Sequence, residues 1–122
     1  MTALLLAVLM VLSMAACASK PAEESDLAYI QDKGTLVVGI TDFAPMDYQN
    51  ESGEWVGFDA DLAKAFADSL GVKVEFVEIV WDNKVLELDS KTIDCVWNGM
   101  TLTEDIMANT ATTKAYAKNA QV

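Results

Sequence analysis

Histidine and arginine are both absent from this sequence of 122 residues, and all eight basic residues are lysines. Without histidine the chain cannot form a Ser-His-Asp triad or a Cys-His pair, and it lacks the commonest protein ligand for transition metals. The two cysteines are too few for a disulfide framework or a paired-cysteine metal site. We therefore expect no metal and no cofactor.

Positive charge is also scarce, because 19 acidic residues outnumber the lysines and give a net charge of -11. A surface of this sign repels nucleic acid and anionic lipid, so we expect no nucleic-acid partner. The length corresponds to about one modest domain. Hydrophobic residues make up 52% of the chain, which is enough for a core.

The N-terminal stretch has the pattern of a targeting segment. No charged residue precedes Lys20, and an apolar run over 3–12 is followed by small residues before Cys17. This resembles a bacterial lipoprotein signal, so we expect residues 1–16 to be removed and Cys17 to carry the lipid. An uncleaved membrane anchor is the alternative, because the uncharged stretch approaches the roughly 20 residues that span a bilayer. Residues 17–25 predict a flexible tether.

Hydrophobic patterns and capping residues predict alternating strands and helices after the tether. Ser25 and Gly34 are expected to begin and end the first helix, and Thr103 to cap the last one. The expected elements are a helix over 25–34, a strand over 35–40, a hairpin over 48–56, a helix over 59–71, a strand over 72–76, a short helical piece around 84–88, a strand over 93–97 and a helix from 103 onward.

The helix over 59–71 has the clearest pattern. Asp59 is predicted to be its N-cap and Gly71 its C-terminal stop. Leu62, Phe66 and Leu70 recur at four-residue spacing, which indicates an apolar face directed at the core.

Strands that alternate with helices predict an α/β fold with a parallel sheet and right-handed crossovers. In open parallel sheets, ligands lie beyond the carboxyl ends of the strands, where the strand order reverses. Two aromatic rings in converging loops could enclose a ligand there, while polar groups orient it. An ordinary strand-to-helix connection is the alternative, because any single ring is more commonly part of the core. The candidate residues in these loops are Asp42, Phe43, Trp81, Asn98, Gly99, Thr101 and Thr103.

Four stretches, over 39–45, 57–62, 93–103 and 116–122, carry a family resemblance through their order and spacing. From Leu27 onward the chain resembles the extracytoplasmic solute-binding proteins of polar amino-acid ABC importers. The resemblance implies the type II periplasmic-binding-protein fold, in which two lobes close around a solute.

The resemblance also implies roles for individual residues. It implies that the ring of Phe43 packs on the bound amino acid and that the ring of Trp81 closes its other side. The polar turn of Asn98, Gly99 and Thr101 is implied to bond the solute's α-carboxylate and α-amino groups.

One position departs from the family pattern. An arginine near the start of the last helix usually clamps the solute's carboxylate, and Ile106 stands there in this chain. An aliphatic side chain cannot make that charge-assisted contact. We expect the carboxylate to be held either by backbone N–H groups at the helix start, where Thr103 lies, or by a lysine from elsewhere.

The family members that the chain resembles are more than twice its length. We therefore expect residues 26–122 to be a partial first lobe, with the second lobe absent. Because closure of both lobes around the solute excludes water, we expect the chain alone to be marginally stable and to bind amino acids weakly or not at all.

The predicted function is the substrate-binding component of an ABC importer and not an enzyme. It would capture an amino acid or similar small polar solute outside the membrane, to which its lipid anchors it, and deliver that solute to permease and ATPase subunits. The same fold occurs in the sensor domains of receptors and histidine kinases, which is one alternative. A dehydratase or lytic transglycosylase is another, because several carboxylates are present for acid–base chemistry. These are Asp42, Asp47, Glu54, Asp59 and Asp82, although caps and turns account for most of them.

Overall fold

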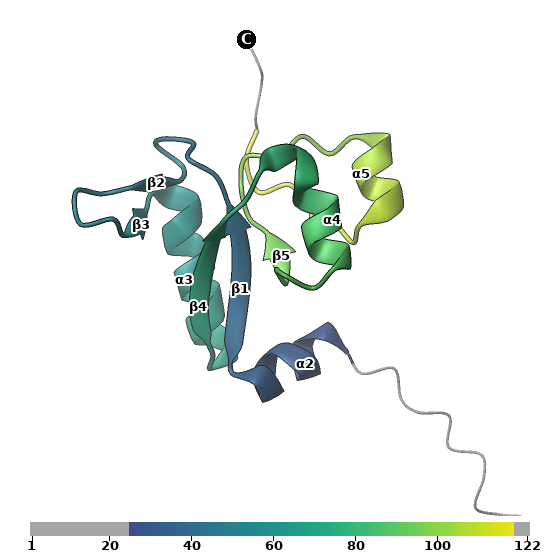
Figure 1. Cartoon of the computed structure of the whole chain (residues 1–122), viewed down its shortest axis with the longest axis horizontal. Helices are drawn as coiled ribbons and strands as arrows, with labels where there is room; N and C mark the ends of the chain where they lie inside the picture. Colours follow the sequence, from purple (N-terminus) through teal and green to yellow (C-terminus); the bar gives the residue numbers. More distant parts are fainter. Residues whose placement is uncertain (1–24, 119–122) are drawn as a thin grey trace, which may run out of the picture.

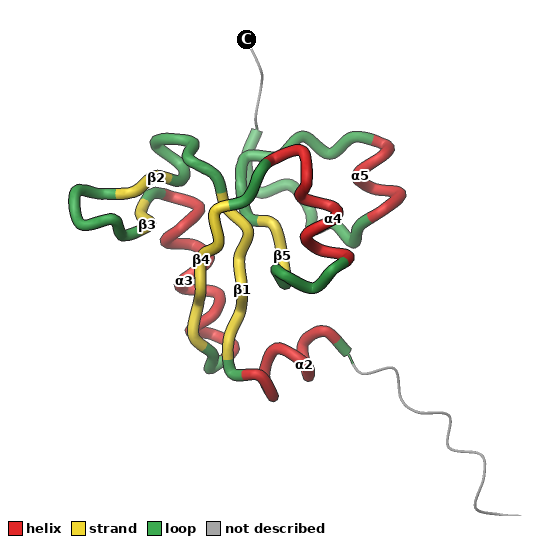
Figure 2. Tube along the Cα trace, in the orientation of Figure 1, coloured by secondary structure: helices red, strands yellow, loops and turns green. Residues whose placement is uncertain are grey.

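The computed structural model of the chain describes residues 25–118, as a small sheet surrounded by short helices (Figure 1). The expected alternation of strands and helices is confirmed (Figure 2). The elements in chain order are α2 (Asp26–Lys33), β1 (Thr35–Ile40), β2 (Tyr48–Gln49), β3 (Trp55–Val56), α3 (Phe58–Leu70), β4 (Lys73–Glu78), the 3₁₀ helix η1 (Trp81–Asn83), α4 (Lys84–Asp89), β5 (Cys95–Val96) and α5 (Glu104–Asn109).

The central sheet is parallel, as predicted, with the strand order β4-β1-β5. Val38 at the centre of β1 pairs with Phe76 of β4 on one side and with Cys95 of β5 on the other. The chain therefore moves to one side of β1 first and crosses to its other side afterwards. This reversal lies between β1 and β5, so their carboxyl ends are where a ligand site is expected.

Helix α3 packs against the sheet through alanines. Ala63 and Ala67 are fully buried with Leu36, Val38 and Val72 in one core cluster. Small side chains let the helix axis approach the strands closely, which explains why the contact face is built from alanine. A helix packed on a parallel sheet is the arrangement expected of the α/β class, and Figure 1 shows α3 beside β1 and β4.

The expected apolar face of this helix is wrong in detail. Leu62 and Phe66 remain 37% and 44% exposed, because they lie on the flank of α3 and not on the alanine face that meets the sheet. The expected N-cap is also wrong. Gly57 occupies the cap position, and Asp59 lies inside the first turn with 1% of its surface exposed. The carboxylate turns inward because the loop before β2 packs over the helix start, where Asp59 donates its backbone N–H to the Met46 carbonyl at 2.9 Å.

Helix α2 begins and ends where its capping residues predict. The Ser25 hydroxyl accepts the Ala28 N–H at 3.1 Å, and Gly34 ends the helix in the left-handed conformation with φ 74°. An ion pair then links this helix to the residue directly before β5, because Lys33 Nζ lies 2.7 Å from Asp94 Oδ2. The same carboxylate oxygen accepts the Val37 backbone N–H at 2.7 Å.

We expect Asp94→Ala to lower the free energy of unfolding by about 2–3 kcal/mol, because a nearly buried carboxylate with two partners is removed. Urea titration followed by circular dichroism measures this. The matched control is Glu54→Ala, which removes an ion pair to Lys64. The Glu54 carboxylate is 65% exposed, so we expect this change to cost no more than about 1 kcal/mol. Equal losses in the two variants would contradict the role of Asp94.

Some predictions lie outside the described residues. The predicted leader over 1–16, most of the predicted tether over 17–25 and the predicted lipid attachment at Cys17 belong to the part of the chain before Ser25. Between Ser25 and Lys118, no helix has the length and apolarity that crossing a membrane requires. The same residues contain no cluster of three potential metal ligands.

Candidate functional site

A hydrogen-bonded pair joins the loops that follow β1 and β5. Asn98 Nδ2 donates to the Thr41 hydroxyl at 2.7 Å, and Asn98 Oδ1 accepts the Thr41 backbone N–H at 3.4 Å. Asn98 comes directly after the last ladder bond of β5, in which Trp97 donates its N–H to the Gly39 carbonyl. The two loops at the reversal of strand order are therefore held together by one side chain.

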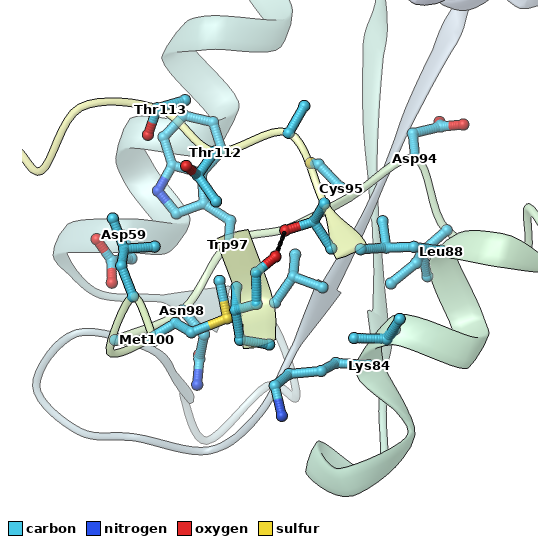
Figure 3. Close-up of a pocket in the computed structure, with 18 of the residues that line it drawn as sticks. Asp59, Lys84, Leu88, Asp94, Cys95, Trp97, Asn98, Met100, Thr112 and Thr113 are labelled. Carbon is cyan, nitrogen blue, oxygen red and sulfur yellow. Dashed lines mark hydrogen bonds between the residues drawn. The ribbon is translucent and has the colours of Figure 1, made fainter. Parts of the chain in front are cut away.

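A cavity of about 900 Å³ opens beside these loops (Figure 3). Of the predicted site residues, Phe43, Asn98 and Gly99 line it. The other walls come from α2, β1, α3, α4, β5, α5 and the extended segment over 110–118, so the cavity extends along the sheet beyond these loops. The Phe43 ring is 45% exposed, so one face is free to receive a ligand. The volume is within the range of small-molecule sites.

The remaining predicted residues lie elsewhere. Asp42 and Thr101 are solvent-exposed and do not line the cavity. Trp81 forms the start of η1, outside the cavity, and its ring centroid lies 4.6 Å from Lys84 Nζ. The structure thus brings Phe43, Asn98 and Gly99 together and keeps Asp42, Thr101 and Trp81 out of the lining.

Thr103 acts as a helix cap, as its position predicts. Its hydroxyl accepts the Ile106 N–H at 3.3 Å, and its own N–H donates to the Thr101 carbonyl at 3.1 Å. The sequence offers the backbone N–H groups at this helix start for a carboxylate. Those of Thr103 and Ile106 are already paired within the protein. Ile106 is 6% exposed and forms part of the cavity wall.

The cavity wall also contains residues that the sequence patterns did not single out as site residues. Lys84 lines it from the start of α4, and Phe66, Trp97 and Met100 supply apolar surface. The Phe66 and Trp97 rings are in contact, with centroids 5.7 Å apart. Its position three residues after Trp81 is the one sequence signal for Lys84, because a lysine at the start of a helix is otherwise unremarkable.

A buried acidic pair adjoins the cavity. Asp47 and Asp59 are 0% and 1% exposed, and the Tyr116 hydroxyl donates to Asp59 Oδ1 at 2.6 Å. Burial, and then the charge of Asp59, raises the pKa of Asp47 to about 7, while the Ala60 backbone N–H acts to lower it. That N–H does not reach hydrogen-bond geometry, and neither carboxylate oxygen of Asp47 has a partner among the described residues.

The same pair also changes the chemistry of Tyr116. Burial raises the pKa of the Tyr116 phenol, and its hydrogen bond to Asp59 raises it further. The phenol therefore stays protonated and keeps donating to Asp59. Asp59 lines the cavity, whereas Asp47 does not.

Cys95 is a poor candidate for nucleophilic chemistry. Burial and the neighbouring Asp94 carboxylate raise the pKa of its thiol to about 12. The reactive thiolate is therefore scarce at neutral pH. A protonated, partly buried thiol of this kind acts as a small hydrophobic residue of its strand.

Two curated relatives align with the folded part of the chain. The L-cystine-binding protein TcyJ of Escherichia coli (strain K12) is 34% identical over 85 residues, which cover 69% of this chain and 32% of the relative. The cyclohexadienyl dehydratase of Pseudomonas aeruginosa is 36% identical over 92 residues, which cover 75% of this chain and 34% of the enzyme. The chain thus spans about a third of the length of these relatives.

A solved structure matches more of its own length. The arginine-bound form of domain 1 from TmArgBP superposes with a TM-score of 0.62 at 41% identity, covering 66% of this chain and 64% of that domain. In that protein, a first domain on its own was crystallised with its ligand. The parallel α/β arrangement described above is therefore that of the first domain of an amino-acid-binding protein.

The family model of the bacterial extracellular solute-binding proteins, family 3, matches residues 36–122. The match begins at the second residue of β1 and includes both loops that Asn98 joins. The resemblance of the four sequence stretches is thereby confirmed. This chain belongs to the bacterial extracellular solute-binding proteins of family 3.

Proposed function

We propose that this chain is the amino-acid-binding component of an ABC importer and supplies part of the first lobe of its binding site. The observation that carries the proposal is that Phe43, Asn98 and Gly99, from the loops at the carboxyl ends of β1 and β5, line one cavity. An aromatic face and polar groups at the reversal of strand order suit a small zwitterionic solute. Delivery to permease and ATPase subunits is part of this proposal, and membership of the family supports it.

The names of the relatives support an amino acid as the solute. One binds L-cystine by its name, and the matched domain 1 is described as arginine-bound. We expect one lobe alone to bind weakly or not at all. The arginine-bound domain 1 favours weak binding over none, because a single domain of that relative holds arginine. We propose that residues 26–122 form part of lobe one and bind the solute weakly until a second lobe covers it.

The N-terminal assignments complete this proposal. We propose that residues 1–16 are a lipoprotein signal, that Cys17 carries the lipid and that residues 17–25 are the tether. This would hold the binding lobe at the periplasmic side or the outer face of the membrane. Incorporation of labelled palmitate, abolished by Cys17→Ser, tests the assignment directly, and an unlabelled wild-type chain would contradict it.

Binding is tested by titrating the ¹⁵N-labelled chain with L-arginine and with L-cystine and following backbone amide signals. We expect the signals of Asn98 and Gly99 to shift with one of these amino acids, in the micromolar to millimolar range. Phe43→Ala should weaken binding about tenfold, since aromatic contacts contribute more than about 1 kcal/mol. Tyr48→Ala is the control, because this ring is similarly exposed but lies in the hairpin, away from the cavity.

Two results would contradict the proposal. One is the absence of any shift at millimolar concentration of either amino acid, in a chain that gives the dispersed spectrum of a folded protein. The other is a set of shifting signals that lies away from the β1 and β5 loops. Equal losses of affinity in Phe43→Ala and Tyr48→Ala would remove Phe43 from the site.

A dehydratase is the second candidate function. The cyclohexadienyl dehydratase among the relatives and the raised pKa of Asp47 are the observations that favour it. Against it, Asp47 does not line the cavity, and Asp59, which does, already accepts a hydrogen bond from Tyr116 at one of its carboxylate oxygens. Turnover of prephenate or arogenate by the purified chain would favour the enzyme over the binding protein.

A further inference from the structure

Lys84 is a half-buried cation that has no carboxylate partner in the described part of the chain. Lys33 pairs with Asp94, and Lys64 pairs with Glu54 and Asp61. The other lysines between Ser25 and Lys118 that lack such a partner are solvent-exposed, whereas Lys84 is not. Burying part of a charged side chain costs solvation free energy unless an opposite charge compensates it. Among the described residues no carboxylate does so for Lys84, although the chain has 19 acidic residues.

The Lys84 ammonium is held in place by Trp81. Its Nζ donates to the Trp81 carbonyl at 3.2 Å and lies 4.6 Å from the centroid of the Trp81 ring. A cation over an indole face gains about 0.5–2 kcal/mol, which restricts the flexible lysine side chain. An ammonium has three N–H donors, so two remain for another acceptor.

The side chain of Lys84 also lies at the relevant end of the cavity. It lines the same cavity as Asn98 and Gly99, and Figure 3 places Lys84 and Asn98 at one end, with Thr112 and Thr113 at the opposite end. The amide of Asn98 is already engaged with Thr41.

Three other lysines line this cavity but are placed differently. Lys91 precedes β5, at the opposite edge of the sheet from the strand ends, and its Nζ lies over the Tyr29 ring at 5.6 Å. Lys114 and Lys118 are exposed on the segment after α5. Among the lysines that line the cavity in the described part of the chain, Lys84 is thus the one at the carboxyl edge of the sheet, where Trp81 holds its ammonium.

We propose that Lys84 binds the carboxylate of the solute, and that Trp81 acts behind it by fixing the ammonium and not by contacting the solute. This rests on the proposed function, because it assigns the anion-binding group of the same cavity. A charge-assisted N–H···O bond to an ammonium is about twice as strong as a neutral one. It also offsets the repulsion that a net charge of -11 imposes on any anion.

The test compares L-arginine with L-argininamide, which lacks the carboxylate, by amide-signal titration of three chains: wild type, Lys84→Met and Lys73→Met. Lys73 is a matched control, since it is an exposed lysine at the start of β4 and does not line the cavity. We expect wild type and Lys73→Met to share one ratio of the two affinities. Lys84→Met should shift that ratio about tenfold toward the amide by lowering the affinity for L-arginine alone. Lys84→Arg should retain most of the wild-type ratio.

Two outcomes would overturn the assignment of Lys84 while leaving the proposed function in place. One is an unchanged ratio in Lys84→Met. The other is an equal loss of affinity for both compounds, which would make Lys84 a structural residue. If the folded wild-type chain binds neither L-arginine nor L-cystine, the proposed function itself fails, and the role of Lys84 fails with it.

Discussion

Replacing Gly57 with alanine is expected to unfold most of the chain at room temperature. Gly57 has φ 115° and ψ 175°, a conformation that only glycine adopts without strain. A Cβ there would lie 2.7 Å from the Pro45 carbonyl oxygen and would overlap the Met46 carbonyl oxygen. Neither oxygen can retreat freely, because Phe58 and Asp59 donate their backbone N–H groups to them at 3.4 and 2.9 Å.

We expect Gly57→Ala to cost at least about 4 kcal/mol, a large fraction of the stability of a small domain. Urea titration and thermal unfolding measure this. Gly53→Ala is the matched control, because Gly53 also has positive φ, 76°, but a Cβ there has nothing within 4 Å. Its expected cost is about 1 kcal/mol, from backbone strain alone. Similar stabilities for the two variants would show that the contact with residues 45–46 is unimportant.

Asp47→Asn is expected to raise the stability of the chain at alkaline pH and to change it little at pH 4. The pKa of Asp47 rises from the ordinary 3.8 to about 7 in the folded state, through burial and then through the charge of Asp59. Between these two values the unfolded chain releases the proton while the folded chain keeps it. Ionisation of Asp47 therefore destabilises the fold increasingly as pH rises through this window, and the full penalty is present above pH 7.

The size of this penalty is on the order of 4 kcal/mol, since each unit of pKa difference corresponds to about 1.4 kcal/mol. An asparagine cannot ionise, so the decline in stability between pH 4 and pH 7 should be much shallower in the variant. Urea unfolding at a series of pH values tests this, with Asp68→Asn as the control, because it removes an exposed carboxylate of α3. Parallel pH profiles for wild type and Asp47→Asn would contradict the prediction.

These two predictions concern one structural unit, the packing of the loop before β2 over the start of α3. The loop carries Phe43 at one end and Asp47 at the other, and Asp47 donates its backbone N–H to the Phe43 carbonyl at 3.0 Å. A change at Gly57 or a charge on Asp47 therefore acts on the segment that presents the Phe43 ring to the cavity. We expect conditions that loosen this unit to weaken solute binding as well.

Local rules explain which elements the sequence predicted well. Ser25, Gly34 and Thr103 act within one turn of their own helix, so their roles follow from neighbouring residues alone. The β-branched run over 35–40 indicated a buried central strand, and β1 is that strand. Phe43, Asn98 and Gly99 could be placed near one another because the carboxyl ends of parallel strands share an edge.

The details that the sequence did not reveal depend on contacts between distant segments. Asp59 has the residue type and position of an N-cap, and only the loop over 44–47 turns it into a buried neighbour of Asp47. The large apolar residues of α3 suggested its contact face, but close packing selects the alanines and leaves Leu62 and Phe66 on the flank. The position of the Lys84 ammonium depends on the ring and carbonyl of Trp81 in η1.

The sequence by itself determined the class of fold and the order of its elements, and it predicted the edge of the sheet at which a solute site is expected. These follow from hydrophobic periodicity, capping residues and parallel connection, which are local or topological properties. Only the tertiary structure decided which side chains reach the cavity and which carboxylates are buried. The physical reason is that burial and hydrogen bonding are set by the distances between segments, and a sequence pattern does not contain those distances.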